Sequence, residues 1–175
     1  KKYGVNTVKR PANLASDNAS SESVVNHAIK QLSIIDEEYE TVILLQPTSP
    51  LRTSVDIDNA FEIMLASDAT AVVSVCKFDN KVLKAFVKKS DGFLNGVYDN
   101  KLPFMRRQDL PSVYMPNGAI YIIQKDKFLM NSSFFTPKCL AYEMDAESSI
   151  DIDTLQDLKE AKKKITNERL ENNNK

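Results

Sequence analysis

The sequence has 175 residues and a net charge of −1, with 42% hydrophobic and 27% charged residues. This profile is typical of one globular domain that folds without disulfides or a structural metal. The balanced charge argues against a nucleic-acid-binding protein, and no apolar run approaches the length that spans a bilayer.

The numbers and positions of the cysteines, the histidine and the glycines exclude two further kinds of site within these residues. The two cysteines lie far apart and only one histidine is present, so cysteine and histidine cannot form a zinc site. No secretory signal opens the chain, and we expect a cytoplasmic protein with reduced thiols. The four glycines are scattered, so these residues contain no glycine-rich phosphate loop.

The first half of the chain predicts alternating helices and strands. Ser20–Leu32 carries apolar residues at helical spacing, and Thr41–Leu45 is a short β-branched run typical of a strand buried on both faces. Thr53 can cap a helix that continues to Ala66, and Ala71–Cys76 predicts a second buried strand. This order of strand, helix and strand predicts an α/β fold with parallel strands.

The second half begins with a different pattern, a hairpin followed by a long loop. Lys84–Lys88 and Phe93–Tyr98 flank a Ser-Asp-Gly turn and predict a hairpin. Leu102–Pro116 is rich in Pro and Arg and predicts a long loop. Beyond it we expect a strand, a short helix, a strand and a last helix, at 119–123, 125–130, 140–144 and 154 to about 165. We expect one domain over residues 1–166 and a frayed polar tail over 167–175.

A first candidate site follows the strand at Thr41–Leu45. Gln46 lies at the carboxyl end of that strand, where α/β sheets bind ligands. Its amide can both donate to and accept from a base or a sugar. Pro47 and Pro50 stiffen the turn and hold its polar groups in place. The alternative is an ordinary strand-to-helix turn that ends in a helix cap.

A second candidate is the pair of adjacent arginines in the predicted loop. Arg106 and Arg107 repel one another unless an anion or an acidic partner compensates their charge. A guanidinium group binds phosphate or carboxylate in bidentate geometry, so the pair indicates an anion site. The alternative is a solvated pair on the protein surface.

A third candidate is the acidic pair Asp151 and Asp153. In an extended segment, residues two apart share a face, so both carboxylates project together while Ile150 and Ile152 face the core. Neighbouring carboxylates raise each other's pKa unless a cation is present, which favours a hard divalent ion such as Mg²⁺. The alternative is that Asp153 caps the last helix, a role that does not exclude metal binding by Asp151.

Five stretches, in this order, resemble the acylneuraminate cytidylyltransferase family, the CMP-sialic acid synthetases and their close relatives. They are RPANLASD with its following serines (Arg10–Ser21), LLQPTSPLR (Leu44–Arg52), RRQDLP (Arg106–Pro111), PNGAIYI (Pro116–Ile122) and SIDIDT (Ser149–Thr154). The likeness runs from about Tyr3 to Ile165. It implies a Rossmann-like nucleotide-diphospho-sugar transferase fold with a mixed, mostly parallel sheet between helices.

The resemblance also implies a reaction and its residues. Family members join CTP to a nine-carbon keto-sugar acid with Mg²⁺ and release pyrophosphate. By the resemblance, Arg106 is the catalytic arginine, and Asp151 and Asp153 hold the metal. The residues implied in binding nucleotide or sugar are Arg10, Ser20, Ser21, Gln46, Arg107, Gln108, Asn117 and Tyr121. The family's dimers, whose middle segment reaches into the partner, imply an interface role for Phe134 and Phe135.

Two features depart from the family pattern. The family's first strand and its Gly/Lys/Arg-rich loop around the CTP phosphates are absent from these residues, so we expect the fold to be incomplete at its N-terminus. We also expect the isolated chain to bind CTP weakly through Arg10, Arg52, Arg106 and Arg107. Met115 stands where some sialic-acid members have an arginine, which leaves legionaminic acid, pseudaminic acid or ketodeoxyoctonate open as the sugar. The alternative function is a catalytically silent dimerisation or regulatory module.

Overall fold

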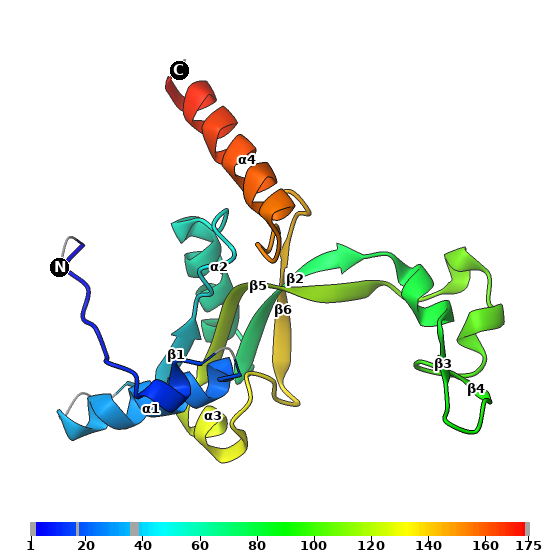
Figure 1. Ribbon diagram of the computed structural model, residues 1–175, viewed down its shortest axis with the longest axis horizontal. Coiled ribbons are helices and arrows are strands. Elements are labelled where there is room, and N and C mark those ends of the chain that lie inside the picture. Colours follow the sequence, from blue (N-terminus) through cyan, green and yellow to red (C-terminus); the bar gives the residue numbers. More distant parts are fainter. Residues whose placement is uncertain (1–2, 17, 36–38, 174–175) are drawn as a thin grey trace.

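A mixed sheet forms the centre of the fold. In the computed structural model, which describes residues 3–16, 18–35 and 39–173, this sheet has four strands. Their order is β1 (Thr41–Leu44), β5 (Val113–Gln124), β2 (Ala71–Phe78) and β6 (Cys139–Met144) (Figure 1). β5 runs antiparallel to both of its neighbours, and β2 pairs in parallel with β6. Strands β1, β2 and β6 therefore share one direction, and the predicted mixed α/β sheet is confirmed. Two of the three strand pairs in this described sheet are antiparallel, so its pairing is not mostly parallel as predicted.

The unit of β1, α2 (Ser54–Leu65) and β2 is present, but its two strands are not neighbours. β5 lies between them, with Tyr121 paired to Leu44 of β1 and to Val73 of β2. β5 therefore separates the two strands of the predicted unit, and their predicted parallel direction is confirmed. The prediction that the strand at Thr41–Leu45 is buried on both faces is wrong, because β1 lies at the edge of the described sheet and Ile43 is 40% exposed.

Helices cover both faces of the sheet. Neighbouring residues of β5 point to opposite faces, and Ile122 packs in the cluster beneath α2 with Ala60 and Met64. Ile123 packs on the other face, where Val25 of α1 (Ser21–Ile34) and Phe128 of α3 (Lys125–Asn131) cover it. The predicted helices in these places are confirmed, and Ser20 is the N-cap of α1, with its Oγ accepting from the N–H of Ser23.

Residues 79–112, here called the arm, project from the sheet beyond the ends of β2 and β5 (Figure 1). The arm carries the predicted hairpin as the antiparallel pair β3 (Phe86–Lys88) and β4 (Leu94–Gly96). Three short 3₁₀ helices complete it, at Asn80–Lys84, Leu102–Phe104 and Arg107–Asp109. The predicted loop ends too late, because β5 begins at Val113, which pairs with Phe78 of β2.

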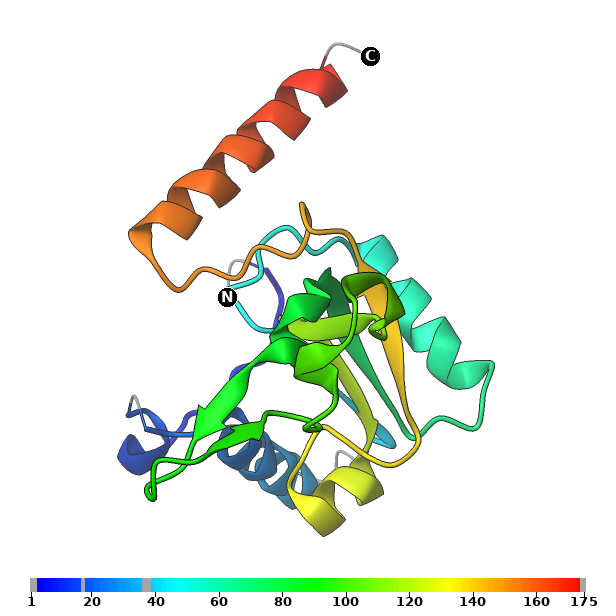
Figure 2. The same cartoon turned by 90° about the vertical axis from the view of Figure 1, so that its right-hand side faces the viewer.

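The last helix, α4 (Leu155–Asn173), stands away from the sheet in both views (Figure 2). It begins after a capping pair in which the backbone N–H and the hydroxyl of Thr154 donate to Asp157, at 2.7 and 2.8 Å. It continues past the predicted end near Ile165 into the polar segment 167–175. No helix within the described ranges is long and apolar enough to cross a membrane.

Candidate active site

The turn after β1 is the centre of the candidate site. Gln46 is half-buried, and its carbonyl accepts from the N–H of Ser49 at 3.4 Å, which closes the turn. The hydroxyl of Ser49 is fully buried and donates to the carbonyl of Asn117 at 3.1 Å. Thr48 accepts a backbone hydrogen bond from Ile152 at 2.9 Å. The turn therefore touches both the middle of β5 and the segment that carries the acidic pair.

A bulge in β5 faces this turn. The pairing of β2 with β5 changes register between Val73, which faces Tyr121, and Val75, which faces Pro116. Four residues of β5 therefore stand opposite Ser74, the single residue between those two valines. Gly118 adopts φ +74° inside the bulge, a backbone conformation that residues with a side chain rarely adopt. The sequence predicted a loop that ends at Pro116 and a strand that begins at Ala119, and the structure makes this boundary a bulge inside one strand.

The side chain of Asn117 holds this bulge together. Its Oδ1 accepts from the Ser74 hydroxyl at 2.6 Å and from the N–H of Ala119 at 3.2 Å. Its Nδ2 donates to the Ser149 hydroxyl at 2.9 Å, on the segment before the acidic pair. Asn117 is 5% exposed, and its amide is occupied by partners inside the protein. The structure thus places Asn117 below the cavity surface, and its predicted contact with the sugar stays a prediction.

Beside the turn lies a cavity of about 470 Å³ on the α1 and α3 face of the sheet. Its lining includes five residues that the sequence predicted for the site or the interface: Ser21, Gln46, Tyr121, Phe134 and Phe135. A neighbouring cavity of about 290 Å³ shares Ser21 and Gln46 and adds Arg10. The structure therefore brings together predicted residues that the sequence separates by more than one hundred positions.

The two phenylalanines of this cavity differ in environment. Phe134 is 7% exposed and packs against the rings of Tyr121 and Phe128, with centroids 5.5 and 4.8 Å away. Phe135 is 69% exposed. Phe134 therefore belongs to the core beneath the cavity, and Phe135 is the member of the pair that is accessible for an interface.

The acidic pair lies next to the turn. Asp151 is half-buried, and its Oδ1 is buried without a hydrogen-bond partner among the described residues. Asp153 is exposed, and it does not cap α4, because Thr154 and Asp157 form that cap. Within the ranges that the structure describes, no group of three His, Cys, Asp or Glu residues could hold a metal.

Electrostatics connect Asp151 to the cavity. The pKa of Tyr121 is raised, first because the phenol is half-buried and then because Asp151 and Glu22 bring negative charge to it. Tyr121 and Glu22 both line the larger cavity. The charge of Asp151 therefore acts at the cavity wall, close to where a ligand would lie.

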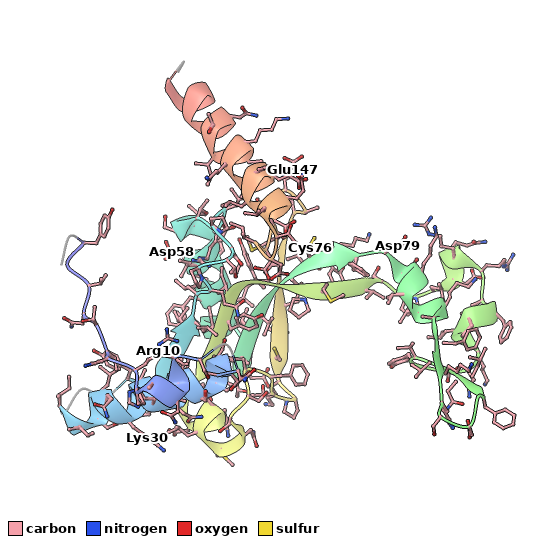
Figure 3. All side chains as sticks on the ribbon, viewed as in Figure 1. Arg10, Lys30, Asp58, Cys76, Asp79 and Glu147 are labelled. Carbon is pink, nitrogen blue, oxygen red and sulfur yellow. The ribbon has the colours of Figure 1, made fainter. Side chains whose placement is uncertain are left out.

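The predicted arginine pair lies elsewhere. Arg106 and Arg107 are on the arm, where Arg106 pairs with Asp109 at 3.0 Å and Arg107 pairs with Asp79 at 3.4 Å. Arg107 and Gln108 line a separate cavity of about 520 Å³. Figure 3 shows Asp79 on the arm and Arg10 on the opposite side of the molecule, beside α1. Within one chain, the arginine pair and the Gln46 cavity are thus separate.

Comparison with known proteins identifies the family. No family model matches the chain. It is 34% identical over 154 residues to an N-acylneuraminate cytidylyltransferase of Streptococcus agalactiae serotype V, which covers 88% of this chain and 36% of that protein. It is 31% identical over 164 residues to a pseudaminic acid cytidylyltransferase of Campylobacter jejuni, covering 92% of this chain and 69% of that protein. The chain belongs to the acylneuraminate cytidylyltransferase family.

The cytidylyltransferase relatives differ in length and in the sugar acid that their names give. A CMP-N,N'-diacetyllegionaminic acid synthase of Legionella pneumophila is 30% identical, over 83% of this chain and 62% of its own length. The chain spans little more than a third of the length of the Streptococcus relative, at 36%. In this member of the family, four of the five motif stretches meet around the Gln46 turn, and the RRQDLP stretch alone lies on the arm.

The sequence did not indicate two residues that build the site, and it indicated another role for a third. Ser49 and Ser74 carry buried hydroxyls that hold the turn and the bulge. Arg52, which was expected to attract CTP, donates to the carbonyl of Gln46 in the turn and to the carbonyl of Ala119 in the bulge. A serine in the middle of an otherwise apolar strand was the available signal for Ser74, because a buried hydroxyl needs a partner. Ser49 and Arg52 lie inside a motif, but the sequence does not indicate what they contact.

Proposed function

We propose that the protein containing this chain joins CTP to a sialic-acid-like nonulosonic acid, giving the CMP-sugar and pyrophosphate. The observation that carries the proposal is the meeting of Arg10, Ser21, Gln46 and Tyr121 at two adjoining cavities in a chain with cytidylyltransferase relatives. The names of the relatives include N-acylneuraminate, pseudaminic acid and diacetyllegionaminic acid, so the sugar belongs to this class of nine-carbon acids.

The two cavities suit the two substrates differently. The larger one has about 470 Å³, the size of a small-molecule site, and aromatic walls on which a sugar ring can pack. The smaller one offers the exposed guanidinium of Arg10 beside the first turn of α1, which suits a nucleotide anion. Gln46 lines both cavities and can hydrogen-bond either substrate.

The reaction then follows from this arrangement. The anomeric hydroxyl of the sugar acid attacks the α-phosphorus of CTP and loses its proton, while the bond to the bridging oxygen breaks and pyrophosphate leaves. Negative charge grows on the phosphoryl oxygens during this step, and cationic groups fixed in place stabilise it. Arg10 supplies such a group in the described cavity, and Arg106 is proposed as the second.

The acidic segment fits a divalent cation. Asp151 Oδ1, which is buried and has no hydrogen-bond partner in the part of the chain that the structure describes, is a hard oxygen donor, and Asp153 adds a second carboxylate two residues later. Because protein sites for Mg²⁺ often use one or two carboxylates together with substrate phosphates and water, two aspartates are sufficient. When bound, Mg²⁺ would neutralise charge on the triphosphate.

The arm explains why we propose a homodimer. Its apolar side chains are unusually exposed, with Phe93 at 73%, Tyr98 at 81% and Phe104 at 83%. A surface of this kind is typical of an interaction site. Because Arg106 lies on the arm and not at the cavity of its own chain, a dimer in which the arm docks on the partner would let Arg106 serve the partner's site.

A cytoplasmic setting is part of the proposal. Cys76 and Cys139 are both free thiols, which is compatible with a reducing compartment. CTP and a biosynthetic sugar acid would also be met there.

The test is a pyrophosphate-release assay on the protein encoded by the complete reading frame. We expect turnover with CTP, Mg²⁺ and one nine-carbon acid from a panel of N-acetylneuraminic, pseudaminic and legionaminic acids, and none with ATP or GTP. Turnover with the eight-carbon ketodeoxyoctonic acid alone would contradict the proposed class of sugar. Gln46→Ala should reduce turnover, whereas Lys138→Gln, which removes an exposed ion pair with Asp68, should not. Absence of turnover with every acid, in a folded dimer, would favour the silent dimerisation module instead.

A further inference from the structure

Arg52 bridges the turn after β1 and the bulge of β5, the two segments that meet at the candidate site. Its Nη1 donates to the carbonyl of Gln46 at 3.2 Å and to the carbonyl of Ala119 at 2.6 Å. The first carbonyl belongs to the turn after β1, and the second belongs to the bulge of β5. The side chain is half-buried and follows directly from the turn that it holds. One guanidinium nitrogen therefore ties the turn to the bulge.

A second set of contacts fixes the acidic neighbour of Arg52. Asp56 accepts from the backbone N–H and the hydroxyl of Thr53, at 2.7 and 2.6 Å, in the capping box of α2. Its other oxygen accepts from the Tyr142 hydroxyl at 2.9 Å. Burial lowers the pKa of Arg52, and the charge of Asp56 partly opposes that shift. The guanidinium thus has a carboxylate held near it by α2 and β6.

The two carbonyls that accept from Arg52, those of Gln46 and Ala119, lie where the side chain of Gln46 contacts the β5 bulge. The Gln46 carbonyl accepts from both Ser49 and Arg52, so the backbone that carries its side chain is held at one point by two donors. Ala119 follows Gly118, the residue whose backbone lies against the Gln46 amide. Loss of Arg52 would remove one of the two donors to the Gln46 carbonyl and the Arg52 donor to the Ala119 carbonyl, at the place where turn and bulge meet.

We propose that Arg52 is a positioning residue of the cytidylyltransferase site: it sets the place of Gln46 against the β5 bulge and does not bind the triphosphate. This inference rests on the proposed function, and it departs from the expectation that Arg52 attracts CTP as a free cation. A lysine ammonium also carries several N–H donors on one nitrogen, but its side chain is one bond shorter than the path to Arg52 Nη1 and lacks the planar guanidinium, so we expect Arg52→Lys not to hold both carbonyls in the same place.

The first experiment does not depend on activity. The complete wild-type protein, labelled with ¹⁵N-arginine and ¹⁵N-glycine, is titrated with pyrophosphate and observed by NMR. We expect the Arg52 guanidinium resonances to stay unchanged. In Arg52→Gln and Arg52→Lys, we expect the Gly118 amide resonance to move, while in Lys138→Gln it stays in place. Movement of the Arg52 resonances with pyrophosphate, or an unmoved Gly118 resonance in both variants, would overturn the proposal.

The second experiment uses the kinetics of the complete enzyme. We expect both Arg52 variants to lower kcat by about 100-fold, while the KM for CTP changes by less than about threefold. Rescue by Arg52→Lys, together with a raised KM for CTP in Arg52→Gln, would identify a charge contact and overturn the proposal. If wild-type enzyme shows no transfer, the proposed function fails, and the NMR result still decides the role of Arg52. If Arg52→Gln does not fold, the wild-type titration and Arg52→Lys still decide it.

Discussion

Gly118 lies directly against the side chain of Gln46. A Cβ added at Gly118 would stand 2.6 Å from Gln46 Oε1 and 3.0 Å from Ser49 Oγ, both closer than ordinary van der Waals contact. The same Cβ would lie 3.4 Å from Asp151 Oδ2. One glycine of the β5 bulge is therefore packed between the proposed substrate contact and the proposed metal ligand, and its lack of a side chain lets the three segments meet.

Gly118→Ala should displace Gln46 as well as strain the backbone. The left-handed backbone alone costs about 1–2 kcal/mol for a residue with a Cβ, and the steric overlap adds to this cost. We expect lower stability in urea unfolding and a marked loss of cytidylyl transfer in the complete enzyme. Gly92→Ala is the matched control, because Gly92 has φ +90° but no atom within 4 Å of an added Cβ. Equal effects of the two substitutions on activity would contradict this account.

Local patterns were enough to predict most elements and part of the site. The helices, the strand that begins at Ala71 and the hairpin could be predicted because each follows its own periodicity. Gln46 could be predicted because it follows the carboxyl end of a strand, although that strand is an edge strand and not buried on both faces as the sequence predicted. The insertion of β5 between β1 and β2 was not readable, since strand pairing depends on contacts far apart in sequence. The bulge was missed for a related reason, because it requires Ser74 and Asn117 to meet across two strands.

Asn117→Ala should destabilise the fold, because the side chain of Asn117 holds the β5 bulge through buried hydrogen bonds. The substitution leaves the buried hydroxyl of Ser74 and the N–H of Ala119 without their shared acceptor. We expect a loss of about 2–3 kcal/mol in unfolding free energy. Asn26→Ala is the control, because Asn26 donates one hydrogen bond to Ser132 at an exposed site. If Asn117→Ala is as stable as the wild type and only its KM for the sugar acid is raised, Asn117 binds the sugar, as the sequence predicted.

Arg106 should act on the cavity of the partner. Arg106→Ala in the complete enzyme should lower kcat more than CTP affinity, because its contact strengthens as charge develops. Mixing the Arg106→Ala and Gln46→Ala proteins should recover about a quarter of wild-type activity, because half of the dimers are mixed and each carries one intact site. The control mixes Gln46→Ala with Arg10→Ala, two residues of one cavity, and should recover nothing. If the first mixture recovers no activity, Arg106 does not act on the cavity of the partner.

The titration of Tyr121 should report the charge of Asp151. Burial first, and then the negative charges of Asp151 and Glu22, raise the pKa of this phenol above its ordinary value. Asp151→Asn should therefore lower the pKa of Tyr121. Asp153→Asn is the control and should leave it unchanged, because Asp153 is not among the groups that raise it. The measurement is a pH titration of ¹³C-labelled tyrosine by NMR.

The direction of this shift also fixes a pH dependence of stability. A phenol whose pKa is higher in the folded state contributes stability below its unfolded pKa of about 10, and that contribution is lost as the pH rises through the folded value. Stability should thus decline above about pH 10, and less so in Tyr121→Phe. Mg²⁺ should lower the Tyr121 pKa in the wild type but not in Asp151→Asn, because the cation would offset the carboxylate charge beside the phenol. An equal effect of Mg²⁺ on both proteins would show that the cation binds elsewhere.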